Sequence, residues 1–180
     1  PYWSGDLSWD LFTLSNYQAL FTTPGIVDSV VTSVTTSIIA VLICVPIGFG
    51  VANLMVRRQD LRILRTVADI ITALPMGIPA VIFGVGFLLT YTAPPLILYG
   101  TKAVIVLVYV VLMIPFATRM QLTALISMGD KYEEASAGSG AGPLATMARI
   151  TLPMLRPTIL SSIALMFILL THEFAASLMV

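Results

Sequence analysis

Charged residues are scarce in this sequence. Lys, Arg, Asp and Glu make up 10% of its 180 residues, whereas soluble domains carry about 25%. A soluble fold of this length would have too much surface for so few charges, so lipid must cover part of it. Nine basic residues balance nine acidic ones, and no basic tract or RNA- or DNA-binding motif occurs. The composition therefore indicates a membrane protein and excludes nucleic acid as an expected partner.

Cysteine and the common catalytic motifs are also nearly absent. Cys44 is the only cysteine, which excludes a disulfide framework and a thiolate metal cluster. The sequence contains no Gly-x-x-x-x-Gly-Lys-Ser/Thr loop, so we expect the chain to bind no ATP itself. It also lacks His-Glu-x-x-His, Gly-x-Ser-x-Gly and an intramembrane carboxylate pair. We therefore expect no enzyme, no cofactor and no metal site, with an intramembrane enzyme kept as an alternative.

Long uncharged runs dominate what is present. Crossing the hydrocarbon core of a bilayer takes about 20 helical residues, and neither Ser29–Val56 nor Ile70–Thr101 contains a charge. A shorter run lies between Lys102 and Arg119, whose side chains can snorkel to the two interfaces. No alternation of about 10-residue segments suggests a β-barrel. We predict an all-α membrane protein with about four transmembrane helices, at about 29–56, 67–91, 101–120 and 157–180.

The basic residues give these spans a direction. If the first span runs inward, eight of the nine basic residues fall on the cytoplasmic side, and only Lys102 lies outside. Residues 1–28, rich in aromatic side chains, then form an extracytoplasmic, partly interfacial segment, either a plain linker or a partner-binding stretch. The chain begins without Met and stops in an apolar run, so we expect a fragment truncated at both ends. Residues 29–180 are predicted to form one transmembrane domain.

The predicted cytoplasmic loop, residues 121–156, is unusually long. Asp130 is a plausible N-cap, and Glu133 stands three residues later, as in a capping box. Glycines at 138, 140 and 142 should end this first short helix, and Pro143 should open a second. Pro153 and Pro157 are expected to break the chain before the last span. The resulting hairpin could either dock a partner or simply cover the bundle.

This loop resembles a known motif. Glu134-Ala135-Ser136, Gly140 and Ile150-x-Leu152-Pro153 match the spacing of the EAA motif of ABC importer permeases. Only Ser136 departs from it, since the family has Ala there. The stretches NYQALF, ALPMGIPAVIFGVGFLL and LPMLRPTILSS extend the likeness over nearly the whole chain. They are most similar to the type I permeases for ferric iron.

The resemblance implies a type I permease bundle that works by alternating access. Its solute would be Fe³⁺, or thiamine, a polyamine, sulfate or phosphonate, and a passive channel is a further alternative. The implied partners are a cytoplasmic ATPase dimer that uses ATP and Mg²⁺, a second permease unit (a homodimer mate or a fused half), an extracytoplasmic solute-binding protein and membrane lipid. The implied location is the inner membrane of a prokaryote.

The resemblance also assigns residues. Glu134 would pair with a basic residue of the ATPase, Ala135 and Ser136 would fill its cleft, and Gly140 would make a turn that allows no Cβ. The residues expected to couple the chain to the ATPase are Glu133, Glu134, Ala135, Ser136, Gly140, Ile150, Leu152 and Pro153.

Two further places are candidates for the translocation path. Pro75, Gly77 and Pro79 interrupt the second span, which either lines a pore or only kinks to fit the bundle. His172 and Glu173 are ionisable residues within the last predicted span, and such residues are functional candidates by default. They could line the path of a cation. They could equally be a hydrated or packing pair near the outer interface. Finally, Asp69 lies within reach of Arg65 one helical turn back, so we expect a structural ion pair there.

Overall fold

The computed structural model describes residues 14–58 and 60–180, and every regular element in that part is helical. The predicted all-α class is confirmed. The prediction for residues 1–28 lies outside the described residues at 1–13. The elements are α1 (Ser15–Thr22), α2 (Ile26–Arg57), α3 (Arg62–Ala73), η2 (Leu74–Gly77), α4 (Ala80–Tyr91), α5 (Lys102–Met128), α6 (Lys131–Gly138), α7 (Pro143–Thr146), the π-helical η3 (Met147–Thr151), α8 (Leu152–Thr171) and η4 (Ser177–Met179).

Among the residues that the structure describes, three helical stretches are long and apolar enough to cross a membrane, namely Ile26–Arg57, Lys102–Met128 and Pro143–Thr171. The second predicted span is instead a pair of helices, Arg62–Gly77 and Ala80–Tyr91, which meet at an angle of 104°. Pro79 is the cause at the residue level: its φ of −57° and ψ of 138° are extended and cannot continue a helix. Counting that pair as one broken span gives four.

Several predicted boundaries are wrong. Helix α5 runs to Met128 and keeps Pro115 in its interior, so the loop begins at Gly129 and not at 121. The predicted break at Pro153 and Pro157 is absent, because α7, η3 and α8 follow one another without a gap. Transmembrane helices tolerate proline where neighbouring helices and local π geometry satisfy the freed backbone groups. At its other end α8 stops at Thr171, so the last span does not reach 180.

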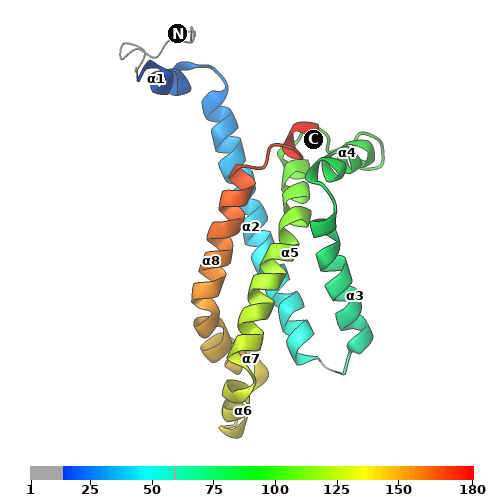
Figure 1. Ribbon diagram of the computed structural model, residues 1–180, viewed down its shortest axis with the longest axis vertical. Helices are drawn as coiled ribbons and strands as arrows, with labels where there is room; N and C mark the ends of the chain where they lie inside the picture. Colours follow the sequence, from blue (N-terminus) through cyan, green and yellow to red (C-terminus); the bar gives the residue numbers. More distant parts are fainter. Residues whose placement is uncertain (1–13, 59) are drawn as a thin grey trace.

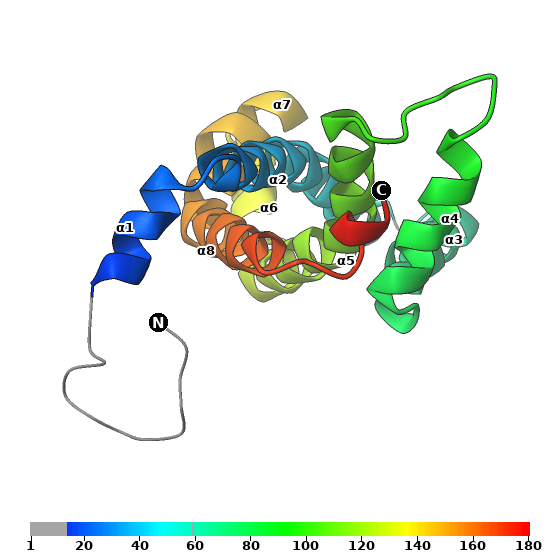
Figure 2. The ribbon, with the colours of Figure 1, turned by 90° about the horizontal axis from the view of Figure 1, so that it is seen from above.

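Helices α2, α5 and α8 form the core of the molecule and lie side by side (Figures 1 and 2). Small residues recur on α2 at every fourth position and all are buried: Ala40, Cys44, Gly48 and Ala52. This spacing places them on one face, where small side chains let two helix backbones approach closely. A Cβ added at Gly48 would lie 2.6 Å from the Cβ of Ala117 on α5.

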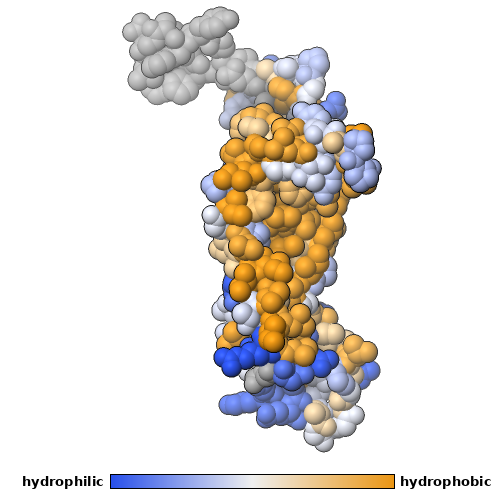
Figure 3. Space-filling view, turned by 90° about the vertical axis from the view of Figure 1, so that its right-hand side faces the viewer, coloured by the Kyte–Doolittle hydropathy of each residue, from blue (hydrophilic) through white to orange (hydrophobic). Residues whose placement is uncertain are grey.

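Helices α3 and α4 stand to one side of this core (Figures 1 and 2). The outer face of α3 is apolar, and Ile63 is 82% exposed there. Figure 3 shows this side of the molecule as a mainly apolar surface, with hydrophilic side chains gathered near its lower end. The connection between α2 and α3 lies at that end of the molecule (Figure 1), and it carries the exposed Arg58 and Arg62. This distribution fits a surface that faces lipid along most of its height.

Candidate functional site

The segment between α5 and α8 folds as a helical hairpin, and Gly140 makes its turn. Gly140 has a φ of +80°, in the left-handed region that glycine adopts without strain. Its N–H donates to the carbonyl of Ala137 at 2.9 Å, and the N–H of Ala141 donates to that of Ser136 at 3.1 Å. These two bonds form a Schellman motif at the end of α6. Pro143 then opens α7 at its first position, as predicted.

The predicted capping box at the start of α6 is not formed. Asp130 has a helical φ of −91° and ψ of −12°, and its side chain makes no capping hydrogen bond. Only its backbone carbonyl takes part, accepting from the N–H groups of Glu133 and Glu134 at 3.0 Å. The side chain of Glu133 does not return to the cap because it is engaged with another helix.

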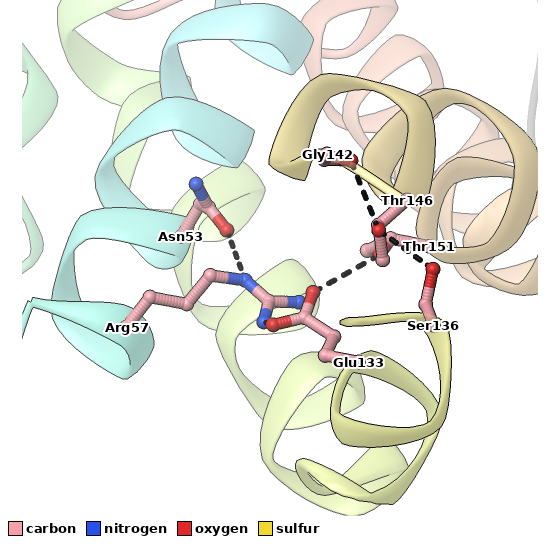
Figure 4. A network of polar contacts seen from close by, with 7 residues as sticks. All are labelled: Asn53, Arg57, Glu133, Ser136, Gly142, Thr146 and Thr151. Atoms are coloured by element: carbon pink, nitrogen blue, oxygen red, sulfur yellow. Dashed lines mark hydrogen bonds and ion pairs between the residues drawn. The ribbon is translucent and has the colours of Figure 1, made fainter. Parts of the chain in front are cut away.

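Glu133 ties the hairpin to the end of α2, as Figure 4 shows. One oxygen of its carboxylate forms an ion pair with Arg57, the last residue of α2. The other oxygen accepts a hydrogen bond of 3.3 Å from the Thr151 hydroxyl in η3. Arg57 in turn donates from Nε to the Asn53 side-chain oxygen at 2.6 Å. One carboxylate therefore holds α2, α6 and η3 together.

The two arms of the hairpin are joined by a pair of hydroxyl groups (Figure 4). Ser136 and Thr146 lie 2.8 Å apart, oxygen to oxygen, and both side chains are buried. Thr146 also donates to the carbonyl of Gly142 at 3.1 Å. In this conformation the Ser136 side chain therefore faces the second arm of the hairpin, and its place in a partner's cleft stays a prediction. The Ser136 hydroxyl makes a hydrogen bond inside the hairpin that the alanine of the family motif could not make.

The remaining coupling residues divide by exposure. Glu134 and Ala135 are exposed on the outer side of α6, next to Glu133, which is half-buried. Adjacent residues of a helix point about 100° apart, so the two glutamates reach different surroundings. Ile150, Leu152 and Pro153 are half-buried. The exposed surface of the hairpin thus includes Glu134, Ala135 and, on α7, Leu144, which is 76% exposed.

The candidate translocation residues do not form one cluster. Pro75, Gly77 and Pro79 mark the bend before α4. His172 and Glu173 follow the end of α8 and so do not lie within a helical span, contrary to the prediction. The Glu173 carboxylate accepts from the N–H of Ala176 at 2.8 Å, and it therefore caps the final turn. Within the described residues, no group of three or more metal-ligating side chains comes together.

Asp69 has a different partner from the one predicted. It pairs with Arg119 of α5 at 2.7 Å, and not with Arg65 one turn back on its own helix. Sequence reasoning missed this contact, and it also missed the roles of Arg57 and Asn53, because all of them depend on which helices become neighbours. The one sequence feature that pointed to the Arg57 contact was its position at the cytoplasmic end of a long apolar run, on the same side of the membrane as the loop that carries Glu133 and Glu134.

Comparison with known proteins places this arrangement among transport proteins. The family described as "Binding-protein-dependent transport system inner membrane component" matches residues 44–180. The chain is 27% identical over 173 residues to the ferric transport system permease protein FbpB of Actinobacillus pleuropneumoniae, covering 93% of this chain and 25% of that protein. It is 31% identical over 107 residues to the putative 2-aminoethylphosphonate transport system permease protein PhnV of Salmonella typhimurium, covering 59% and 40%.

A solved structure shares the fold. The inward-facing MetNI methionine ABC transporter superposes with a TM-score of 0.68 at 19% identity, over 89% of this chain and 73% of that one. The chain spans between a quarter and two fifths of the length of the two sequence relatives above.

Proposed function

The chain belongs to the family of binding-protein-dependent transport system inner membrane components, and from that premise we propose that it forms the permease of an ATP-driven importer in the inner membrane of a prokaryote. The observation that carries the proposal is the hairpin of α6 and α7. Its outer surface exposes Glu134, while Glu133 and Ser136 fasten it from within. A surface that is exposed and also firmly held can transmit a pull from a partner into the bundle.

The partners follow from this role. A cytoplasmic ATPase dimer would grip the hairpin and supply the hydrolysis of ATP with Mg²⁺, and an external binding protein would deliver solute to the opposite mouth. A second permease unit, as a separate chain or a fused half, would complete the path. Closure of the ATPase dimer would then switch the bundle between its inward-open and outward-open states. Alternating access of this kind needs two states that the partners bind with different affinity.

For the solute, we propose ferric iron. The relative named for ferric transport matches 93% of this chain. The relative named for 2-aminoethylphosphonate has a higher sequence identity, 31%, but its match covers only 59% of this chain. We therefore take phosphonate as the second candidate. Thiamine, polyamines and sulfate stay as alternatives from the family resemblance.

Uptake into proteoliposomes tests both the mechanism and the solute. The complete transporter, reconstituted with its ATPase and binding protein, should accumulate ferric iron only when ATP is present inside. The matched assay uses 2-aminoethylphosphonate at the same concentration and should give background counts. Accumulation of the phosphonate alone would overturn the iron assignment. Solute flow down its gradient without ATP would show that the protein is a channel and not an importer.

Substitutions in the hairpin test its role as the ATPase contact. Glu134→Lys and Gly140→Asp should each lower recovery of the ATPase with the purified permease by more than about tenfold. The first reverses a charge at the proposed interface, where placing like charges together typically costs several kcal/mol. The second adds a side chain and a negative charge at the left-handed turn. Gly140→Ala should weaken recovery less, through the roughly 1–2 kcal/mol cost of a left-handed residue with a Cβ.

Gly138→Ala is the control for these variants, since Gly138 ends α6 in the same hairpin and a Cβ there meets no atom within 4 Å. It should leave recovery unchanged, and all variants should insert into the membrane normally. Undiminished co-purification of the ATPase with both Glu134→Lys and Gly140→Asp would refute the assignment of this hairpin.

A further inference from the structure

A cavity of about 570 Å³ lies between the ends of α2, α3 and α5, at the end of the molecule where the basic residues gather. Its walls combine apolar side chains, such as Met55 and Leu125, with a cluster of charges. The charged lining residues are Arg62, Arg65, Asp69, Arg119 and Asp130. Neither the hairpin nor the proposed coupling mechanism uses this cavity.

The arginines are directed into the cavity by the two-faced character of α3. Arg62, Arg65 and Asp69 are spaced three and four residues apart, which places them on one face of the helix. The apolar residues Ile63 and Ile70, 82% and 55% exposed, occupy the other face. An amphipathic helix at a membrane turns its apolar face to lipid and keeps its charges toward a polar interior.

Because Asp69 pairs with Arg119, it does not neutralise the other two arginines of the cavity, Arg62 and Arg65. Asp69 forms its ion pair with Arg119 across the cavity wall, at 2.7 Å. In residues 14–58 and 60–180, no ion pair involves Arg62 or Arg65, and the Nε of Arg65 is buried without a hydrogen-bond acceptor. A buried donor left without an acceptor is costly, so such groups usually have a partner that supplies one. Three arginines against two aspartates give the cavity an excess of one positive charge.

We propose that this cavity binds the phosphate group of an anion, through Arg62 and Arg65. The planar fork of a guanidinium matches two oxygens of a phosphate, and arginine is the side chain that proteins favour for such contacts. Clusters of arginine just beyond a membrane-spanning helix, and basic pockets between helices on that side, are typical sites for anionic lipid headgroups. A free phosphate or phosphonate would present the same oxygens. This inference is independent of the transported solute.

Retention of phosphatidylglycerol by the complete transporter tests the lipid source. After purification in detergent, native mass spectrometry should find phosphatidylglycerol bound to the wild type, and about tenfold less on Arg62→Gln/Arg65→Gln. The matched control is Arg58→Gln/Arg156→Gln, which removes two charges from exposed arginines that do not line the cavity. The control should retain the lipid. Arg62→Lys/Arg65→Lys, which keeps both charges, should retain an intermediate amount and guards against loss through misfolding.

Titration of the delipidated transporter with inorganic phosphate tests the other source. Calorimetric binding that is lost in Arg62→Gln/Arg65→Gln and kept in the control assigns the cavity to a free anion. Loss of lipid retention without any phosphate binding assigns it to the headgroup. If neither probe distinguishes the cavity variant from the control, or if the lysine variant binds no better than the glutamine variant, the site does not exist.

Discussion

Gly48→Leu will push α2 away from α5 and destabilise the bundle, whereas Gly50→Leu will leave its stability intact. At Gly48, even an added Cβ would lie 2.6 Å from the Ala117 Cβ, 2.8 Å from the Ala117 carbonyl carbon and 2.9 Å from the Thr118 nitrogen. Two of these three atoms belong to the backbone, so no side-chain rotation can relieve the clash. Overpacking in a well-packed core costs about 1–3 kcal/mol, and more where the backbone must move.

Gly50 is the matched control because it lies on the same helix, two residues away, and a Cβ there meets no atom within 4 Å. Replacing it by leucine should slightly favour the helix, by up to about 1 kcal/mol. The midpoint of unfolding in sodium dodecyl sulfate, measured for both variants, distinguishes the two positions. Equal midpoints would mean that α2 and α5 do not cross at Gly48.

A rescue experiment sharpens this test. Gly48→Ala alone should lower the midpoint, and adding Ala117→Gly should restore part of the loss, because it removes the nearest of the three clashing atoms. Restoration should be incomplete, since the two backbone atoms remain. A double variant no more stable than Gly48→Ala would point to a different contact.

Glu133→Ala will release the hairpin from the bundle, although the neighbouring Glu134→Ala will not. Removing the Glu133 carboxylate breaks its ion pair with Arg57 and its hydrogen bond with Thr151, and it leaves Arg57 without its acidic partner. Hydrogen bonds to charged groups contribute about 1.5–3 kcal/mol. Because both side chains of the pair are partly exposed, at 20% and 28%, we expect a loss near the lower bound, about tenfold in the local opening equilibrium.

Amide hydrogen exchange over residues 131–146 measures this opening directly. Glu133→Ala should exchange about tenfold faster than the wild type, and Glu134→Ala at the wild-type rate. The charge exchange Arg57→Glu/Glu133→Arg should recover part of the protection. The prediction fails if the two alanine variants exchange alike, since that would mean that Glu133 contributes no more than an exposed glutamate.

Local rules predicted much of the hairpin. The end of the first helix at the glycines and the helix start at Pro143 depend on backbone geometry that neighbouring residues determine, and both are present. The turn at Gly140 in particular was implied by the family resemblance. The same kind of rule failed at Asp130, where the capping box lost its glutamate to Arg57. A local pattern gives the geometry that a segment can adopt, but a stronger partner from another helix can take its side chains.

The contacts between helices could not be predicted from the sequence, because they depend on which helices become neighbours. Asp69 could have paired with Arg65 along α3, and only the position of α5 gives it Arg119 instead. Nothing in the sequence says which of the two adjacent glutamates faces inward, because the rotation of α6 depends on where α2 ends. Prolines could be judged only in part from the sequence. The predicted interruption at Pro79 is present, directly before α4, whereas Pro153 and Pro157 lie inside a continuous helix that they were expected to break.

The unbroken helix from Pro143 to Thr171 has a mechanical consequence. The second arm of the hairpin and the membrane-spanning helix α8 form one continuous helical rod of 29 residues, in which the π-helical Met147–Thr151 is the only departure from α geometry. At 1.5 Å per residue such a rod is about 43 Å long, so a tilt of about 5° at one end displaces the other by about 4 Å. At the far end, the segment after the rod touches α4 where Gly84 meets the Ala176 carbonyl. If the hairpin is the site of a pull, as proposed above, we expect the rod to carry that displacement to the bent pair of α3 and α4.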